Sequence, residues 1–167
     1  MRIAETFVDE MDREVGGTVK ALERVPKDKL DWKPHAKSRT IGQLAQHIAS
    51  LPGVAVLGLQ TGKREMSSGP PVTATDPDFV STFKKSVEQF KAAVGQMSDD
   101  RLNTETFSFT KNDQPVRTWP KAVFLRNVVM NHFIHHRGQL TVYLRLLDIS
   151  VPAIYGTSAD ENPFAGK

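Results

Sequence analysis

The chain has 167 residues, of which 39% are hydrophobic and 25% charged, with no cysteine and a formal net charge of +3. This composition is typical of a globular protein, and it excludes a disulfide framework, a cysteine-based zinc site and a thiol nucleophile. Because lysine and arginine are scattered among acidic residues and form no basic stripe, we do not expect a nucleic-acid surface.

The length favours a single domain over residues 1–167, large enough to close a hydrophobic core without metal or disulfides. The N-terminal sequence "MRIAETFVDEMDREV" is acidic and is unlike a signal peptide. No segment approaches the roughly 20 apolar residues of a membrane span. The sequence therefore predicts a cytoplasmic protein that contacts no membrane.

The first predicted helix runs from Ala4 to Leu22, where apolar residues recur at steps of three and four. Pro26 is expected to stop it. The charged segment "KDKLDWKPHAKSR" follows and is typical of a connection.

A capping box, "TIGQ" at residues 40–43, predicts the start of a second helix. Its apolar face contains Leu44, Ile48, Leu51 and Ala55. Pro52 interrupts this face, so we expect a kink or an early end near residues 49–51.

Residues 61–78 are rich in Gly, Pro, Ser and Thr and predict a surface loop. Asp76 is the expected N-cap of a third helix, with Pro77 at its first position and Asp78 favoured by the helix dipole. The apolar stripe of this helix extends from Val80 to Met97.

Polar and apolar residues then alternate in "TETFSFT", and "KNDQPVRT" supplies turn residues, so a short strand or hairpin is predicted. The last helix is expected to begin with Thr118 as its cap and Pro120 in its first turn, and to continue to about Leu147. Four amphipathic helices predict an all-α fold, a four-helix bundle with long connections and this short strand or hairpin.

Histidines interrupt two of the predicted apolar faces. His132 and His136 are one turn apart on the last helix, in line with Leu125, Val129, Leu140, Tyr143 and Leu147. His47 lies between Leu44 and Leu51 on the second helix. Three inward imidazoles on two facing helices would suit zinc or nickel, and would also accept iron, manganese or copper.

Hydrogen-bonded core histidines are the alternative interpretation of the same pattern. A single histidine on an apolar face, such as His47 taken alone, is more often a core residue. Two buried imidazoles one turn apart compete for few partners, which a shared metal ion would resolve. Spacing alone leaves both interpretations open.

Two familiar metal motifs are missing. Phe133 follows His132, so this is not the His-Glu-x-x-His pattern of zinc proteases. No Asp or Glu lies between Asp113 and Asp148, which removes the carboxylate ligands of di-iron bundles. A single three-histidine ion would keep open coordination positions and would lower the pKa of a water or thiol.

Other polar residues surround the histidine pair. His135 lies about 100° around the helix from His136, and is a candidate to support the metal ligands from outside the ligand set or to line a pocket. Asn131 and Gln139 are candidates to orient imidazole N–H groups. Arg137 is expected to be solvated or salt-bridged, or to bind an anionic substrate if it lies near a metal.

The segments "SRTIGQLAQHIA" and "NHFIHHRGQLTVYLRLLDISVPAIYG" resemble the DinB-like family, and the likeness extends from about Ile3 to Tyr155. This family belongs to a wider superfamily that includes thiol-dependent S-transferases and maleylpyruvate isomerases. The resemblance implies a homodimeric four-helix bundle that binds a divalent metal, commonly zinc or nickel. It places the three metal ligands on His47, His132 and His136, and leaves His135 outside the ligand set.

The resulting hypothesis is a metal-dependent enzyme, a thiol S-transferase or a hydrolase, in which the ion activates a thiol or water toward a small electrophilic substrate. No catalytic residue is assigned. One alternative is a non-catalytic stress-response protein that binds a metal or a small ligand. Another is a purely structural bundle with core histidines.

Overall fold

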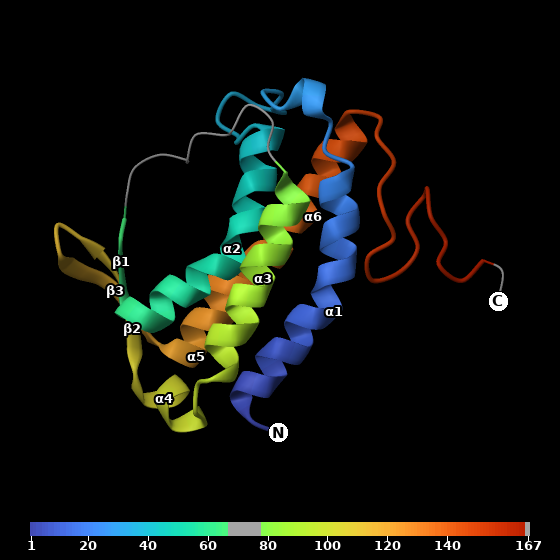
Figure 1. Ribbon diagram of the computed structural model, residues 1–167. Coiled ribbons are helices and arrows are strands. Elements are labelled where there is room, and N and C mark those ends of the chain that lie inside the picture. The colour runs from blue at the N-terminus through green and yellow to red at the C-terminus, as the bar shows by residue number, and fades with distance from the viewer. Residues whose placement is uncertain (67–77, 166–167) are drawn as a thin grey trace.

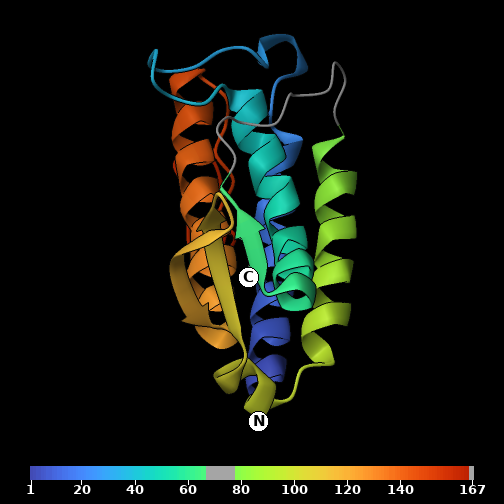
Figure 2. The same cartoon turned by 90° about the vertical axis from the view of Figure 1, so that its left-hand side faces the viewer.

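A computed structural model describes residues 1–66 and 78–165 of the chain. The fold is mostly helical, and its long helices lie side by side (Figures 1 and 2). The helical elements are α1 (Ile3–Glu23), η1 (Lys27–Lys29), α2 (Ile41–Thr61), α3 (Phe79–Gly95), α4 (Asp99–Thr104), α5 (Lys121–Phe124), η2 (Leu125–Met130) and α6 (Asn131–Leu146). Among the described residues, no helix has the length and apolar character needed to cross a membrane.

A small mixed sheet covers one side of the helices, as Figure 2 shows. Its strands are β1 (Lys63–Glu65), β2 (Thr106–Lys111) and β3 (Gln114–Pro120), in that order. β2 and β3 form the predicted antiparallel hairpin, whereas β1 pairs with β2 in parallel. The expectation of a mostly helical fold is confirmed, but "all-α" is too narrow a description.

The first two predicted helices are present. α1 matches the predicted span of residues 4–22 to within one residue at each end. The capping box at the start of α2 is complete, because Gln43 N donates to Thr40 Oγ1 at 3.2 Å and Thr40 N donates to Gln43 Oε1 at 3.1 Å. This cap fixes the start of the helix that carries His47.

Of the two predicted effects of Pro52, a kink or an early end near residues 49–51, the early end is wrong, because the helix continues through Pro52 to Thr61. Its axis bends along its length (Figure 1). The second half of the helix buries Ala55, Gly58 and Leu59, and this packing offsets the backbone hydrogen bond that proline cannot make.

Two predicted helix caps need correction. α3 is capped by Asp78, whose Oδ1 accepts from Ser81 N at 2.8 Å, whereas Asp76 and Pro77 lie outside the described residues. Thr118 is not the cap of the last helix, because it belongs to β3 and its hydroxyl lies 2.7 Å from that of Ser108 on β2. The hairpin therefore occupies residues that the sequence pattern assigns to a helix start.

The predicted loop over residues 61–78 also needs correction at its start. Residues 63–65 form β1 and join the sheet. Most of the remaining predicted loop, residues 67–77, lies outside the described part of the chain.

The core is closely packed where α2 meets α5 and the hairpin. The rings of Phe107 and Phe124 stack with their centroids 4.0 Å apart. A Cβ atom built on Gly58 would lie 2.4 Å from Cζ of Phe124 and 3.1 Å from Cδ2 of Phe107. Only glycine fits at this position of α2.

This contact gives a matched pair of glycine substitutions on α2. We expect Gly58→Ala to lower the free energy of unfolding by about 1–3 kcal/mol, because a rigid ring must shift. Gly53→Ala should be neutral or stabilising by about 0.5–1 kcal/mol, since its Cβ would come no closer than 3.7 Å to Ser86. Urea denaturation of both variants measures the difference, and equal stability would contradict the packing described.

Candidate metal centre

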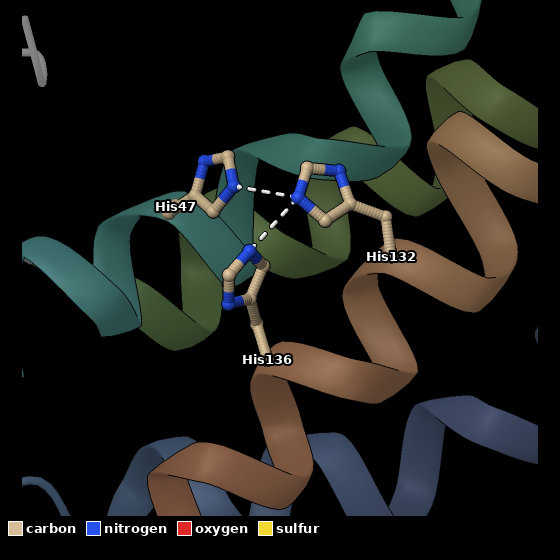
Figure 3. Close-up of side chains that lie close together, drawn as sticks. All are labelled: His47, His132 and His136. Atoms are coloured by element: carbon tan, nitrogen blue, oxygen red, sulfur yellow. Dashed lines mark hydrogen bonds between the residues drawn. The ribbon is translucent and has the colours of Figure 1, made fainter.

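His47, His132 and His136 meet between α2 and α6. Figure 3 shows the three rings directed toward one another, with His47 on α2 and the other two histidines on α6. The Nε2 atom of His132 lies 3.5 Å from that of His47 and 2.8 Å from that of His136. One ligand nitrogen from each residue lies within 4.8 Å of the others, so the group could hold a metal ion.

The histidines flank the buried face of α6 and are not centred on it. The fully buried side chains of this helix are Phe133, Arg137, Leu140 and Leu144. His132, His136 and Tyr143 are only partly buried, so the predicted inward stripe is displaced by about one residue. One side of each of these imidazoles is therefore nearer to solvent than the sequence predicted.

The π-helical segment η2 explains this displacement. It precedes α6 without a break, and both Val129 and Met130 are buried within it. A π turn takes up an extra residue, which shifts the residues of the next turns around the helix axis. Phe133 and Arg137 thereby take the inward positions predicted for His132 and His136.

The hydrogen bonds of two imidazoles fix the tautomers of the neutral rings. His136 Nδ1 lies 2.7 Å from Gln139 Oε1, and His132 Nδ1 lies 3.3 Å from the carbonyl oxygen of Val128. Both partners are acceptors, so each neutral ring carries its proton on Nδ1. Both Nε2 atoms then present lone pairs toward each other at 2.8 Å.

The rings are held in the neutral form. Burial, reinforced by the charge of Arg39, lowers the pKa of His47 to about 3. Burial also lowers the pKa of His136 to about 4, although the bond to Gln139 opposes the shift. The pKa of His132 is lowered by the same cause. At neutral pH all three nitrogens are available as ligands.

This arrangement fits a divalent cation. Two imidazole nitrogens bound to one tetrahedral zinc ion lie about 3.3 Å apart, given Zn–N bonds of about 2.0–2.1 Å. The observed separations of 2.8 and 3.5 Å bracket that value. Facing lone pairs repel without a cation or proton between them, so the donor set suits a metal ion.

The remaining histidines stand outside the group. His135 is exposed, and its ring meets that of His136 edge to face with centroids 5.1 Å apart. His35 is exposed in the loop before α2, where its Nδ1 accepts from Lys37 N. Asn131 is exposed, and within residues 1–66 and 78–165 its side chain makes no hydrogen bond to the three imidazoles. The carbonyl of Val128, which no side-chain pattern could indicate, contacts His132 instead.

Arg137 is oriented away from the histidines. It is 2% exposed, and its Nη1 lies 2.7 Å from Oε2 of Glu14 on α1. Nη1 also donates to Thr18 Oγ1 at 2.9 Å, and Nη2 donates to the Tyr155 hydroxyl at 2.6 Å. The salt-bridge alternative is confirmed, whereas the solvated position and the role in binding an anionic substrate do not fit this buried guanidinium, whose Nη1 and Nη2 both have partners.

A different arginine lies near the centre and was missed by the sequence analysis. The charge of Arg39 contributes to the lowered pKa of all three imidazoles. Arg39 precedes the α2 cap and is separated from His47 by eight positions, so helical spacing gave no reason to select it.

The fold and the site define a mostly helical protein with a three-histidine group able to hold a metal ion. The DinB family model matches residues 1–163, and the chain belongs to the DinB family. A relative named uncharacterized protein YrdA, from Bacillus subtilis strain 168, is 24% identical over 160 residues, covering 93% of this chain and 89% of its own.

Two solved structures resemble this fold. A DinB-like protein from Bacillus cereus ATCC 10987 is 27% identical with a TM-score of 0.71, covering 90% of this chain and 97% of its own. A DinB-like protein of Bacillus subtilis, YjoA, is 23% identical with a TM-score of 0.66, covering 89% of this chain and 96% of its own. The second similarity concerns the fold alone.

The lowered pKa values predict how the metal-free protein responds to acid. An unfolded histidine has a pKa of about 6.5, so below that pH the unfolded chain binds protons that folded His47 and His136 do not. Stability contributed by the neutral rings is complete above about pH 6.5 and is lost as the pH falls toward the folded values.

Urea denaturation at about pH 7.5 and pH 5 tests this expectation. Between these two pH values, the free energy of unfolding of the metal-free wild type should fall further than that of the double variant His47→Gln, His136→Gln. The expected difference is on the order of 1 kcal/mol per histidine, after allowance for the partial exposure of the rings. The same loss in both proteins would show that the two imidazoles do not resist protonation.

Proposed function

We propose that this protein binds one divalent metal ion, zinc or nickel, through His47, His132 and His136. The observation that supports this most directly is the pair of neutral Nε2 atoms facing each other at 2.8 Å, with the third Nε2 3.5 Å away. Gln139 holds the Nδ1 proton of His136 and thereby keeps its Nε2 lone pair directed into the group.

We further propose that the protein is an enzyme, a thiol S-transferase or a hydrolase, acting on a small electrophilic substrate. When bound, the ion supplies Lewis acidity that lowers the pKa of a thiol or water. In the thiol reaction, sulfur forms a bond to the electrophilic carbon, the leaving group departs with its electron pair, and the thiol proton passes to solvent.

The protein's own residues set the conditions for this chemistry. The three ligands are neutral, so they leave the full charge of the ion available to an incoming group. No Asp or Glu occurs between Asp113 and Asp148, so the α6 side of the centre offers no carboxylate to act as a base or to close the coordination. Activation by the metal takes the place of a general base.

The proposal includes the finer architecture and the assembly. α1, α2, α3 and the continuous run of α5, η2 and α6 would be the four helices of a bundle, which Figure 1 supports by their side-by-side arrangement. Family resemblance supports a homodimer, and the expected location in the cytoplasm is kept as part of the proposal. Light scattering of the purified protein measures the oligomeric state, and a monomer at micromolar concentration would contradict the dimer.

Metal content gives the first test of the centre. Protein purified without a histidine tag should carry about one divalent ion per chain, because three converging imidazoles complete most of a tetrahedral site. His136→Gln should lose most of that metal while keeping its helical content, since the core closes without the ion. Elemental analysis and circular dichroism provide the two measurements.

His135→Gln is the matched control for this experiment. It removes an imidazole from the adjacent position of the same helix, but His135 lies outside the three-histidine group. It should retain wild-type metal content. Equal metal loss in both variants, or a metal-free wild type after reconstitution, would rule out the proposed centre.

Thiol binding gives the test of the enzyme. The zinc-loaded wild type should bind 2-mercaptoethanol with release of a proton, measurable by calorimetry in buffers of different ionisation enthalpy, whereas metal-free protein should not. Turnover of a panel of alkyl halides and epoxides with that thiol would then support transfer chemistry. Metal binding without thiol binding or any turnover, including hydrolysis, would indicate a non-catalytic metal-binding protein.

A further inference from the structure

Arg39 is fixed at the same contact between α2 and α6 that brings the histidines together. It directly precedes Thr40, the N-cap of α2. Its carbonyl oxygen accepts from the Tyr143 hydroxyl at 3.4 Å, and Tyr143 lies about two turns beyond His136 on α6. The Tyr143 ring is supported by an edge-to-face contact with Trp32, with centroids 5.6 Å apart. Both helices therefore hold the backbone that carries this guanidinium.

The Nη1 atom of Arg39 has no hydrogen-bond partner in the part of the chain that the structure describes. Within residues 1–66 and 78–165, it is the one buried side-chain nitrogen or oxygen atom that has no hydrogen-bond partner. In the same part of the chain Arg39 forms no ion pair, whereas Arg126 binds both carboxylate oxygens of Glu10 at 2.7 Å. Burying a charged donor without an acceptor is costly, so the site is suited to receive an anion.

The surroundings are positively charged. Arg39 adds a positive charge about two turns before His47 along α2, beside Tyr143 of α6, which lies about two turns beyond His136. The three-histidine group contains no carboxylate among the described residues. A divalent ion held by neutral ligands would add its full charge, and such a region attracts an anionic ligand.

We propose that Arg39 is a specificity-determining residue that binds the carboxylate of a small substrate or thiol cosubstrate at the histidine centre. This inference rests on the proposed function, because the ligand contacts the metal and Arg39 together. A guanidinium presents paired N–H donors that match the two oxygens of a carboxylate. The free Nη1 would donate to one of them.

The test compares two thiols of similar size on zinc-loaded protein. 3-Mercaptopropionate carries a carboxylate, whereas 2-mercaptoethanol is neutral, and calorimetry gives the Kd of each. The wild type should bind the carboxylate thiol about tenfold more tightly. Arg39→Gln should lose that preference while keeping its affinity for 2-mercaptoethanol, and Arg39→Lys should recover only part of it because lysine lacks the paired donors.

Arg13→Gln is the matched control, because it removes the same charge from an exposed position of α1. It should retain the wild-type preference for 3-mercaptopropionate. Elemental analysis and circular dichroism of every variant ensure that metal content and folding are unchanged.

The outcomes separate the two proposals. Unchanged preference in Arg39→Gln, the same loss in Arg13→Gln, or no preference in the wild type overturns the role of Arg39 and leaves the metal centre standing. A wild type that takes up no zinc, or takes up zinc and binds neither thiol, overturns the proposed function, and the role of Arg39 falls with it.

Discussion

The meeting of three neutral imidazoles between two helices is the constraint on which the rest of this site depends. His132 and His136 each direct the Nδ1 proton to an oxygen, so their Nε2 lone pairs face each other and His47. A protein interior does not stabilise such an arrangement by itself, because lone pairs without a donor between them repel. The core must therefore supply the rigidity, and a cation is the natural source of compensation.

Much of that rigidity comes from the neighbours of α6. On one side, Arg137 joins α6 to Glu14 and Thr18 of α1 and to Tyr155 of the C-terminal segment. The Tyr155 hydroxyl also donates to Glu14 at 2.9 Å, so the tyrosine contacts both members of the Arg137–Glu14 ion pair. With Arg137 held on the α1 side, the histidine at position 136 is left on the side that faces α2.

The sequence predicted the parts of this structure that follow from local spacing. The capping box at Thr40 and the hairpin after α4 are confirmed, and the three histidines selected by helical spacing lie together. Each depends on residues only a few positions apart, or on a periodic pattern within one element. Such signals survive folding because the backbone hydrogen bonds that they specify are local.

The errors arose where tertiary packing overrides local preference. Pro52 was expected to kink or end α2, and buried neighbours carry the helix past it. The π-helical segment before α6 rotates the helix without any marker in the sequence. That rotation reverses the expected roles of neighbouring residues, since Arg137 becomes a core residue.

The contrast between two arginines shows what the fold adds to the chemistry. Arg137 is deeply buried, and its guanidinium binds Glu14, Thr18 and Tyr155. It therefore stabilises the fold and is not available to bind a ligand. Arg39 is less buried, yet its Nη1 has no hydrogen-bond partner among residues 1–66 and 78–165. Its position next to His136 in the sequence favoured Arg137 as the residue that binds an anionic ligand. The hydrogen bonds of the two side chains favour Arg39 for this role instead. The proposed anionic ligand is therefore assigned to the arginine with an unpaired donor, and not to the arginine nearest His136 along the helix.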